Sequence, residues 1–275
     1  MNAGAPPLGA VPAGARERLS VVVITGNEAA TIRGCLDSAR FADEILVVDS
    51  FSTDDTVAIA RSCGARVLQR EFAGFARQKN WAIAQAAHEW VLQLDADERV
   101  TPELTEEILD LLSRRPAHEA YQVRRLNFFL GRPMRYTGWG FDRVTRLFRR
   151  HVRFKDVEVH EEIDLPGPLP TLRARLDHHS FRSFAQYLRK IDLYSEYGAR
   201  RAHREGRRAS LEKILLRPPA RFLRLYVLRL GFLEGMHGLV LSALAAFSVY
   251  LKYARLWEIK VLAGRKEFPA DRADR

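Results

Sequence analysis

Three acidic residues follow a short apolar segment near the middle of the first half of the chain. The apolar residues of VLQLD, residues 91–95, predict a buried strand, and Asp95, Asp97 and Glu98 then fall within four positions. Asp-x-Asp after a buried strand is one arrangement that binds a hard cation such as Mg²⁺ or Mn²⁺ together with substrate phosphate oxygens. The alternative is an acidic loop that only caps the next helix, a role that suits Glu98.

A second acidic loop lies earlier in the chain. Residues 45–48 predict a strand, and the polar segment 49–55 begins with Asp49. Open α/β sheets bind ligands outside the carboxyl ends of their strands. We therefore expect Asp49 and Asp95 at one edge of the sheet, where a binding site rather than core would explain the acids.

The segments around these acids alternate between strand and helix patterns. Four apolar or β-branched runs alternate with three runs of helical spacing, and Gly64 ends the second helix. This rhythm predicts an α/β fold with a mostly parallel sheet and helices on both faces. The expected strands are 20–25, 45–48, 66–71 and 91–95, and the expected helices follow 32, cover 56–62 and cover 75–90.

The pattern changes after residue 100. Residues 101–115 predict a helix with Thr101 as N-cap and Pro102 at its first position, and residues 121–136 and 142–154 predict antiparallel strands. Strand and loop follow, and the chain is expected to be helical from residue 183. The predicted helices there are 183–206, 211–235 and 238–260.

These patterns divide the chain into three parts. Residues 1–18 are rich in Ala, Gly and Pro without a basic start and an apolar block, which predicts a disordered tail rather than a secretory signal. Residues 19–182 are expected to form the α/β domain, and residues 183–275 a helical, basic region. Two cysteines, Cys35 and Cys63, are expected to be unpaired thiols.

Charge is distributed unevenly along the chain. The net charge is +10, yet residues 175–275 carry 21 Lys and Arg against 10 Asp and Glu, while the rest is close to neutral. A basic C-terminal third indicates an anionic partner: a membrane surface, nucleic acid or a phosphorylated acceptor. Nucleic acid fits less well, because the basic residues alternate with bulky apolar ones and no recognition motif appears.

The segments VVDSFSTDDT and LDADE contain the two acidic loops described above. They resemble the V-V-D-S/D-G-S-T-D-x-T loop and the D-x-D region of family-2 glycosyltransferases, which have the GT-A fold. The segments FAGFARQKNWAI, NFFLGRPMRYTGW, DRVTRLFRR, VHEEI and HHSFRSFAQYLRKI are similar to the bacterial lipopolysaccharide core-biosynthesis subgroup, the β-1,4-glucosyltransferase-like proteins. The resemblance covers about residues 19–258.

The resemblance implies a nucleotide-sugar site. It places Thr25, Asn27 and Glu28 beside the nucleotide, and Asp49 on the uracil or ribose. A basic–Asn pair near the diphosphate and ribose would be Lys79 and Asn80, and Asp95 would contact the ribose or sugar. Phe51 stands where the family usually has Gly, and Gly26 where it often has Lys or Tyr. Phe51 therefore implies either a different backbone or a ring lining the pocket.

The resemblance also implies a metal and a catalytic base. Asp97 would be the main ligand of Mg²⁺ or Mn²⁺, and His178 would complete the metal or phosphate site, with a structural histidine as the alternative. An inverting transfer needs a carboxylate that takes the acceptor's proton. Glu161 and Glu162 are the candidates after an alternating strand, and similarity to the family's H-E pair favours Glu161.

Two further residues are candidates in GWGFDRVTRLF. Trp139 could stack on a sugar face, and Arg146 could meet the diphosphate or an anionic acceptor. A core tryptophan and ordinary surface arginines are the alternatives.

The helical region offers a membrane hypothesis. Residues 238–251 are apolar but too short for a span of about 20 residues, so no transmembrane helix is predicted. Residues 215–233 interleave four arginines with Leu, Phe and Tyr, which is typical of a helix at an anionic membrane interface. Packing of this helix on the catalytic domain is the alternative.

The resulting hypothesis is a metal-dependent inverting glycosyltransferase. It would move a sugar, expected to be glucose, from a UDP-sugar to the heptose region of a lipopolysaccharide inner core or another glycolipid. It would work in the cytoplasm, peripheral on the inner face of the cytoplasmic membrane. The alternatives are a polyprenyl-phosphate glycosyltransferase, a nucleotidyltransferase, which would need a Gly-rich phosphate loop that we do not find, and a non-catalytic membrane-binding module with a degenerate sugar-nucleotide fold.

Overall fold

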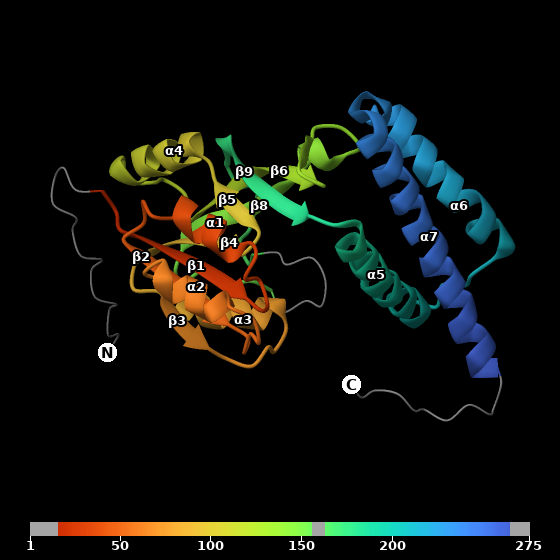
Figure 1. Cartoon of the computed structure of the whole chain (residues 1–275), viewed down its shortest axis with the longest axis horizontal. Helices are drawn as coiled ribbons and strands as arrows, with labels where there is room; N and C mark the ends of the chain where they lie inside the picture. The colour runs from red at the N-terminus through yellow and green to blue at the C-terminus, as the bar shows by residue number, and fades with distance from the viewer. Residues whose placement is uncertain (1–15, 156–162, 265–275) are drawn as a thin grey trace. The chain divides into compact units, whose positions relative to one another are not determined.

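The structure is a computed structural model that describes residues 16–155 and 163–264. It divides into two compact units (Figure 1). The first, the sheet unit, comprises Met1–Leu126 and Phe141–Ser180, and the second, the helical unit, comprises Asn127–Gly140 and Phe181–Arg275. The predicted boundary at residue 182 lies close to this division, but the segment 127–140 groups with the C-terminal helices.

Most strands form one mixed sheet with the order β3-β2-β1-β4-β8-β6-β9-β5, to which β7 adds beside β6. The first four strands in that order are parallel, as expected, with Val22 paired to Leu46 on one side and to Gln93 on the other. The parallel strands and their helices are β1 (Leu19–Thr25), α1 (Ile32–Ser38), β2 (Glu44–Asp49), α2 (Thr56–Ser62), β3 (Arg66–Gln69), α3 (Phe75–Ala84) and β4 (Trp90–Asp95).

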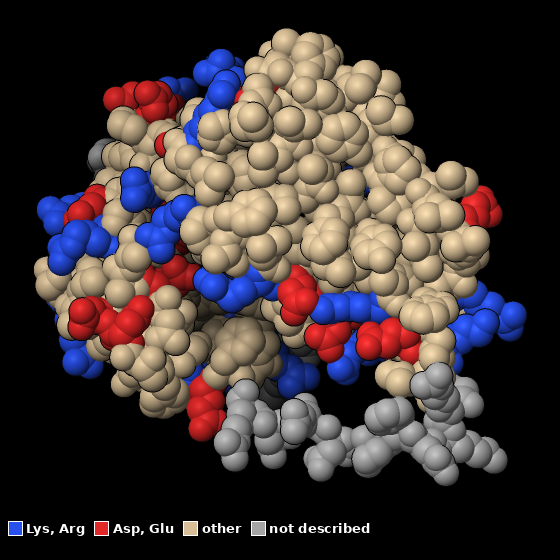
Figure 2. Space-filling view, turned by 45° about the vertical axis from the view of Figure 1, so that its right-hand side comes forward, with Lys and Arg blue, Asp and Glu red and all other residues tan. Residues whose placement is uncertain are grey.

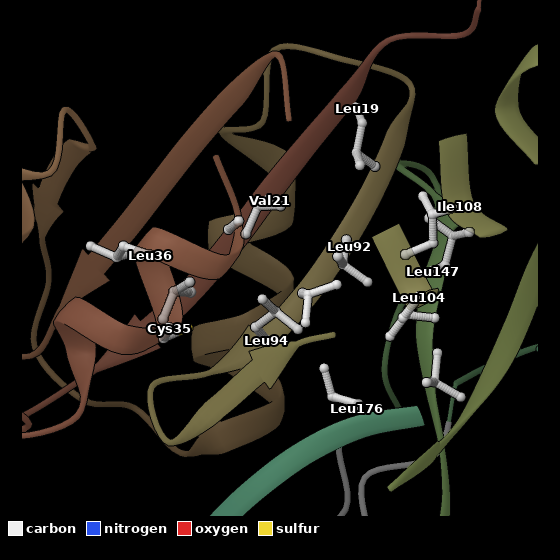
Figure 3. Packing of buried hydrophobic residues seen from close by; sticks show 14 of the residues in the cluster. Leu19, Val21, Cys35, Leu36, Leu92, Leu94, Leu104, Ile108, Leu147 and Leu176 are labelled. Atoms are coloured by element: carbon white, nitrogen blue, oxygen red, sulfur yellow. The ribbon is translucent and has the colours of Figure 1, made fainter. Parts of the chain in front are cut away.

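Both faces of the parallel strands are covered, because consecutive apolar side chains point to opposite faces of the sheet. Val21 and Val23 face a core shared with α1, α2 and α4 (Pro102–Ser113), part of which Figure 3 draws. Val22 and Ile24 face a second core shared with α3. Burying an aliphatic side chain contributes about 1.5–3 kcal/mol, so each strand is fixed on both sides. The predicted α/β sheet with flanking helices is confirmed.

One predicted helix is shorter than expected. The pattern of residues 75–90 favoured a helix throughout, but α3 ends at Ala84 and Trp90 is the first residue of β4. Trp90 is fully buried, with its ring 6.0 Å from that of Tyr121. Burial of this large side chain in the sheet overrides a weak helical preference.

The second half of the sheet is antiparallel, as predicted. Strand β8 pairs with β4 and β6, β7 with β6, and β5 with β9. Thr101 caps α4 by accepting from the backbone N–H of Leu104 at 3.2 Å, as the N-cap pattern indicated. The strands are β5 (Glu98–Val100), β6 (Ala120–Phe129), β7 (Arg132–Met134), β8 (Arg143–Arg149) and β9 (Thr171–Phe181), with a 3₁₀ helix η1 (Trp139–Phe141).

The helical unit is built on three helices, and a helical C-terminal region is thereby confirmed. They are α5 (Phe184–Arg204), α6 (Leu211–Leu223) and α7 (Gly235–Gly264). The predicted single helix over 211–235 is wrong in one respect. After α6 the chain continues as a π-helix η2 (Arg224–Leu228), reverses at Leu230 with a left-handed φ of 55°, and forms a 3₁₀ helix η3 (Gly231–Glu234).

The apolar C-terminal segment is longer than predicted. The stretch Gly231–Leu262, which contains most of α7, has 32 residues and is long and apolar enough to cross a membrane by length and composition. The sequence pattern gave only about fourteen apolar residues, because Lys252 and Arg255 interrupt it. In the structure Arg255, which lies within the predicted helix 238–260, pairs with Asp192 of α5, so this helix makes polar contacts beyond its apolar run.

The two cysteines are free thiols, as expected. Cys35 is buried beneath the end of β4, with its Sγ 3.5 Å from the carbonyl oxygen of Asp95. Burial, followed by the charges of Glu98, Asp97 and Asp95, raises the pKa of this thiol well above its usual value. Cys35 therefore acts as a small neutral core residue.

Candidate functional site

The acidic segment lies in a tight connection between two strands of the sheet. Strand β4 ends at Asp95, Ala96 and Asp97 form the turn, and β5 starts at Glu98. Glu98 is fully buried, and its Oε2 accepts from the backbone N–H of Asp95 at 2.9 Å. Glu98 therefore stabilises the backbone of the loop, a structural role that Asp95 and Asp97 do not share.

Asp95 is held between two buried cations. Its carboxylate lies 3.1 Å from Nζ of Lys79 and 2.5 Å from Nη2 of Arg146. Gln93 also donates to it at 3.2 Å. Burial alone would raise the pKa of Asp95, but the charges of Arg146 and Lys79 outweigh it and hold the pKa well below its usual value. Asp95 is therefore ionised at neutral pH, with most of its charge already balanced by protein.

Arg146 is the hub of this cluster. It donates to Gln93 at 2.5 Å and to Glu98 at 2.7 Å, in addition to Asp95, and it is almost completely buried. Asp95 and Glu98 hold its pKa above the ordinary value against the opposing effect of burial. Its Nε has no hydrogen-bond partner among the described residues. The arginine proposed for an anionic ligand thus contacts the acidic loop in this structure.

The cluster continues through residues that the sequence did not single out. Arg125 of β6 lies 3.3 Å from Glu98 and 2.7 Å from Asp142, which links the loop to the start of β8. Gln93 is fully buried within β4. A glutamine inside an apolar strand was a signal that could have found the cluster, because a buried amide needs polar partners.

Asp97 faces a histidine from another strand. Strands β5 and β9 pair so that Glu98 lies opposite His178, and Nε2 of His178 lies 3.5 Å from Oδ1 of Asp97. Nδ1 of His178 lies 3.0 Å from the hydroxyl of Ser180, and the backbone N–H of His179 donates to Asp97 O at 2.9 Å. The partner on Nδ1 leaves Nε2 directed at the carboxylate, which is the orientation that metal-binding histidines need.

These two side chains fit one divalent cation. A carboxylate oxygen and an imidazole nitrogen at this separation can both reach an ion at about 2.0–2.2 Å. No group of three or more His, Cys, Asp or Glu residues suited to a metal occurs within residues 16–155 and 163–264. Two protein ligands with the remainder from phosphate and water is the pattern of cations that bind with a substrate. The structure brings together the two predicted metal ligands.

The loops after β1 and β2 are tied to each other. Asn27 donates its backbone N–H to the Ser52 hydroxyl at 2.8 Å, and its side-chain oxygen accepts from the backbone N–H of Thr53 at 2.8 Å. The backbone N–H of Glu28 donates to Thr56 at 2.8 Å. Thr25 is buried just before this junction, and its hydroxyl has no partner among the described residues. Predicted nucleotide residues therefore form one connected edge.

Asp49 is fully buried and braces the second loop. Its carboxylate accepts from the backbone N–H of Ser52 at 2.9 Å and from the Ser52 hydroxyl. Gln69 of β3 donates to it at 3.1 Å. The structure places the predicted base-contacting carboxylate at the expected edge, and its present partners are all protein groups.

Phe51 has a left-handed backbone conformation, of the kind that favours glycine. Its φ is 56°, in the left-handed region that costs a non-glycine residue roughly 1–2 kcal/mol. The ring is more than half exposed. Both expectations for this position, a different backbone or a ring lining the pocket, stay predictions.

Three other candidates lie in different surroundings. Asn80 bonds both backbone groups of Phe154, its amide donating to the carbonyl and its oxygen accepting from the N–H, each at 2.8 Å. Trp139 belongs to the helical unit, where its ring packs against those of Phe129 and Phe181. Glu161 lies outside the described residues.

The mostly parallel half of the sheet carries its acidic residues at the carboxyl ends of the strands, which is the edge where α/β folds bind ligands. Comparison with known proteins identifies the family. Residues 20–177 match the model of glycosyl transferase family 2. The chain therefore belongs to that family. The predicted resemblance is confirmed, and the protein is a glycosyltransferase.

Relatives match along nearly the whole chain. An uncharacterized glycosyltransferase of Rickettsia felis is 30% identical over 255 residues, covering 88% of this chain and 90% of the relative. The lipopolysaccharide core biosynthesis glycosyltransferase LpsC of Rhizobium meliloti is 31% identical over 251 residues, covering 86% of this chain and 93% of LpsC. The similarity therefore includes the helical unit.

A solved structure matches part of the chain. Glucosyl-3-phosphoglycerate synthase from Mycobacterium tuberculosis, in complex with Mn²⁺, UDP and glucosyl-3-phosphoglycerate, is 28% identical with a TM-score of 0.35. The match covers 41% of this chain and 44% of that chain.

Proposed function

We propose that this protein is an inverting glycosyltransferase that moves a sugar from a UDP-sugar to a glycolipid of the lipopolysaccharide inner core. Asp97 facing His178 across β5 and β9 is the observation that carries the proposal, because a carboxylate oxygen and an imidazole nitrogen 3.5 Å apart would suit a divalent cation. Similarity to LpsC over nearly the full length of both chains supports the acceptor class. Glucose is the first sugar to test, from the resemblance to β-1,4-glucosyltransferase-like proteins.

Asp97 and His178 are proposed to hold Mg²⁺ or Mn²⁺. When bound, such an ion offsets the negative charge of the leaving diphosphate. Lys79 and Arg146 hold Asp95 ionised and fixed at the same edge, where it would contact the ribose or sugar. Thr25, Asn27, Glu28 and Asp49 are proposed to border the nucleotide.

Glu161 is proposed as the base. It would take the proton from the acceptor hydroxyl while that oxygen bonds to the anomeric carbon and UDP departs with the electrons of the broken bond. A polyprenyl phosphate acceptor would need no base, because the phosphate is already a nucleophile.

A glycolipid acceptor requires that the enzyme work at a membrane surface. We propose the cytoplasmic leaflet as its location and anionic lipid as its partner. The excess of 21 Lys and Arg over 10 Asp and Glu in residues 175–275 supports this, since anionic leaflets attract basic segments.

The donor site is tested first by calorimetric titration of UDP with and without Mn²⁺. Wild type is compared with Asp97→Asn and with Asp110→Asn, which alters a surface pair with Arg114 on α4. We expect Mn²⁺-dependent binding in wild type and Asp110→Asn, and a loss of at least about tenfold in Asp97→Asn. Absence of UDP binding to wild type with either metal would overturn the proposal.

The acceptor is tested by transfer of labelled glucose from UDP-glucose to purified inner-core lipopolysaccharide. Glu161→Gln should bind UDP normally while losing transfer by about 10²-fold or more. Transfer to polyprenyl phosphate that survives Glu161→Gln would instead favour the alternative acceptor.

A further inference from the structure

The connection between α6 and α7 presents an unusual density of exposed apolar side chains. We call residues 223–239 the apolar tip. A monomeric soluble protein rarely exposes so many neighbouring bulky side chains unless they bind something. Six of them are Leu223, Val227, Leu228, Phe232, Leu233 and Met236. Figure 2, which brings the C-terminal helices forward, shows a broad surface without Lys, Arg, Asp or Glu, bordered by charged side chains.

The charges of the apolar tip are positive. Arg224 and Arg229 are exposed, and Glu234 is the single acid in this segment. Glu234 is buried, and its Oε1 accepts from the backbone N–H groups of Arg135 at 2.7 Å and Tyr136 at 3.0 Å. The negative charge of Glu234 is thus stabilised by two backbone N–H groups of the protein itself. What the tip offers to a partner is apolar area with arginines, which complements an anionic and apolar partner.

The tip has a defined backbone. The reversal at Leu230 has a left-handed φ of 55°, and Arg229 O accepts from the N–H of Thr137 at 3.0 Å. A Cβ added to Gly238 would lie 1.8 Å from the carbonyl oxygen of Gly231, so the start of α7 packs directly on the turn. The exposed side chains are therefore carried by a turn whose backbone is held by hydrogen bonds and close packing.

A full crossing by α7 conflicts with its neighbours. Arg217 of α6 hydrogen-bonds Tyr253 of α7 and lies over its ring at 5.2 Å, and Arg255 of α7 pairs with Asp192 of α5. A bilayer around α7 would also enclose these charged partners, each at a cost of several kcal/mol. Insertion of the tip alone leaves them in water or among lipid head groups.

We propose that the apolar tip inserts into the interfacial layer of a bilayer that contains anionic phospholipids, with Arg224 and Arg229 among the head groups. The α6–α7 pair then anchors the enzyme to one leaflet without crossing it. This deepens the proposed function by naming the segment that holds the enzyme beside a glycolipid. It is testable with neither donor nor acceptor present.

The first test is co-sedimentation of the full chain with vesicles of phosphatidylcholine, with and without phosphatidylglycerol. A tip variant, Leu228→Asp with Leu233→Asp, is compared with a control variant at the start of α6, Leu211→Asp with Leu215→Asp. Leu228 and Leu211 have nearly equal exposures, 76% and 72%, at opposite ends of the α6–η2 segment. We expect the tip variant to bind anionic vesicles about tenfold or more weakly than wild type. The control variant at the start of α6 should lose less than about threefold.

Equal losses in both variants, or none in either, would overturn the proposal. Each variant is also titrated with UDP and Mn²⁺, which separates misfolding from lost anchoring. Tip-dependent vesicle binding without UDP binding would leave the anchor standing while the proposed function fails. UDP binding without vesicle binding would overturn the membrane anchor and leave the proposed function standing.

Depth and self-association are measured with the same protein. Brominated lipids should quench a tryptophan placed by Leu228→Trp more strongly than one placed by Leu211→Trp. Similar quenching at both positions would mean that the whole helix pair is immersed. Sedimentation velocity completes the test, because a dimer that becomes a monomer in the tip variant, with vesicle binding unchanged, would assign the tip to a second copy of the chain.

Discussion

Arg146 pairs with the partly buried carboxylate of Asp95 and with the fully buried carboxylate of Glu98, so its side chain braces the acidic turn. Breaking a buried ion pair by removing one partner leaves an uncompensated charge. The same residue is therefore a positioning residue for the cation site, since Glu98 in turn holds the backbone of Asp95 two residues before Asp97.

Arg146→Met should lower the free energy of unfolding by about 3–5 kcal/mol. The matched control is Arg150→Met, because Arg150 pairs with Glu89 where both side chains are more than a third exposed, and such pairs contribute below about 1 kcal/mol. Urea unfolding monitored by circular dichroism measures both. A loss below about 1 kcal/mol in Arg146→Met would mean that the cluster does not brace the turn.

Phe51 allows strain and ring contact to be separated. Phe51→Gly removes both the ring and the left-handed strain, whereas Phe51→Ala removes the ring and keeps most of the strain. The glycine variant should unfold with a free energy about 1 kcal/mol greater than that of the alanine variant. If the ring contacts the base, both should weaken UDP binding by about threefold or more. Unchanged calorimetric affinity in both would remove Phe51 from the site.

At the scale of elements, the Asn80 side chain of α3 hydrogen-bonds the segment after β8. Asn80 satisfies both backbone groups of Phe154, whose ring belongs to the core beneath α3. An amide already bonded in this way braces two elements, and it is the neighbouring Lys79 whose charge faces Asp95.

Asn80→Ala should therefore lower the free energy of unfolding by about 2–4 kcal/mol, because a buried N–H and a carbonyl lose their partners. UDP affinity, measured by titration below the unfolding transition, should stay within about threefold of wild type. Gln85→Ala, at the exposed end of the same helix, is the control. A large loss of UDP affinity with little loss of stability would mean that the Asn80 amide contacts the nucleotide, as the family resemblance implies.

Elements with one dominant pattern could be predicted from the sequence, and elements decided by distant contacts could not. The run of β-branched and apolar residues in β1 and the cap at Thr101 are local signals, and both were confirmed. The end of α3 depends on burial of Trp90, and the break at Leu230 depends on bonds to residues about a hundred positions earlier. Sequence periodicity carries no information on such partners.

The same division applies to the candidate site. The edge positions of Asp49 and Asp95 followed from strand order alone. The approach of His178 to Asp97 depends on the β5–β9 register, so only family resemblance indicated it. The partners of Arg146 were missed, because an arginine in a strand gives no sign of whether it will be buried.

At the scale of the whole molecule, each unit has cores of its own. The sheet unit encloses two clusters on its two faces, and the helical unit encloses clusters around Phe129 and Tyr253. Separate cores favour separate cooperative transitions.

Calorimetric heating should therefore resolve two transitions. Saturating UDP and Mn²⁺ should shift only the transition of the sheet unit, since ligand at 100 times its dissociation constant adds about 2.7 kcal/mol to the unit that binds it. Anionic vesicles should shift only the other. A single transition that responds to both additions would show that the units unfold together.

Glu234 has a practical consequence for producing the protein in pieces. By accepting from the backbone of residues 135 and 136, it ties the 127–140 segment, which contains the end of β6 and the whole of β7, to the C-terminal helices. A fragment that stops at Ser180 would retain Phe129 and Met134 but lose Tyr187 and Leu241, which cover them. A shortened enzyme without the C-terminal helices would therefore also need a short polar loop in place of the 127–140 segment.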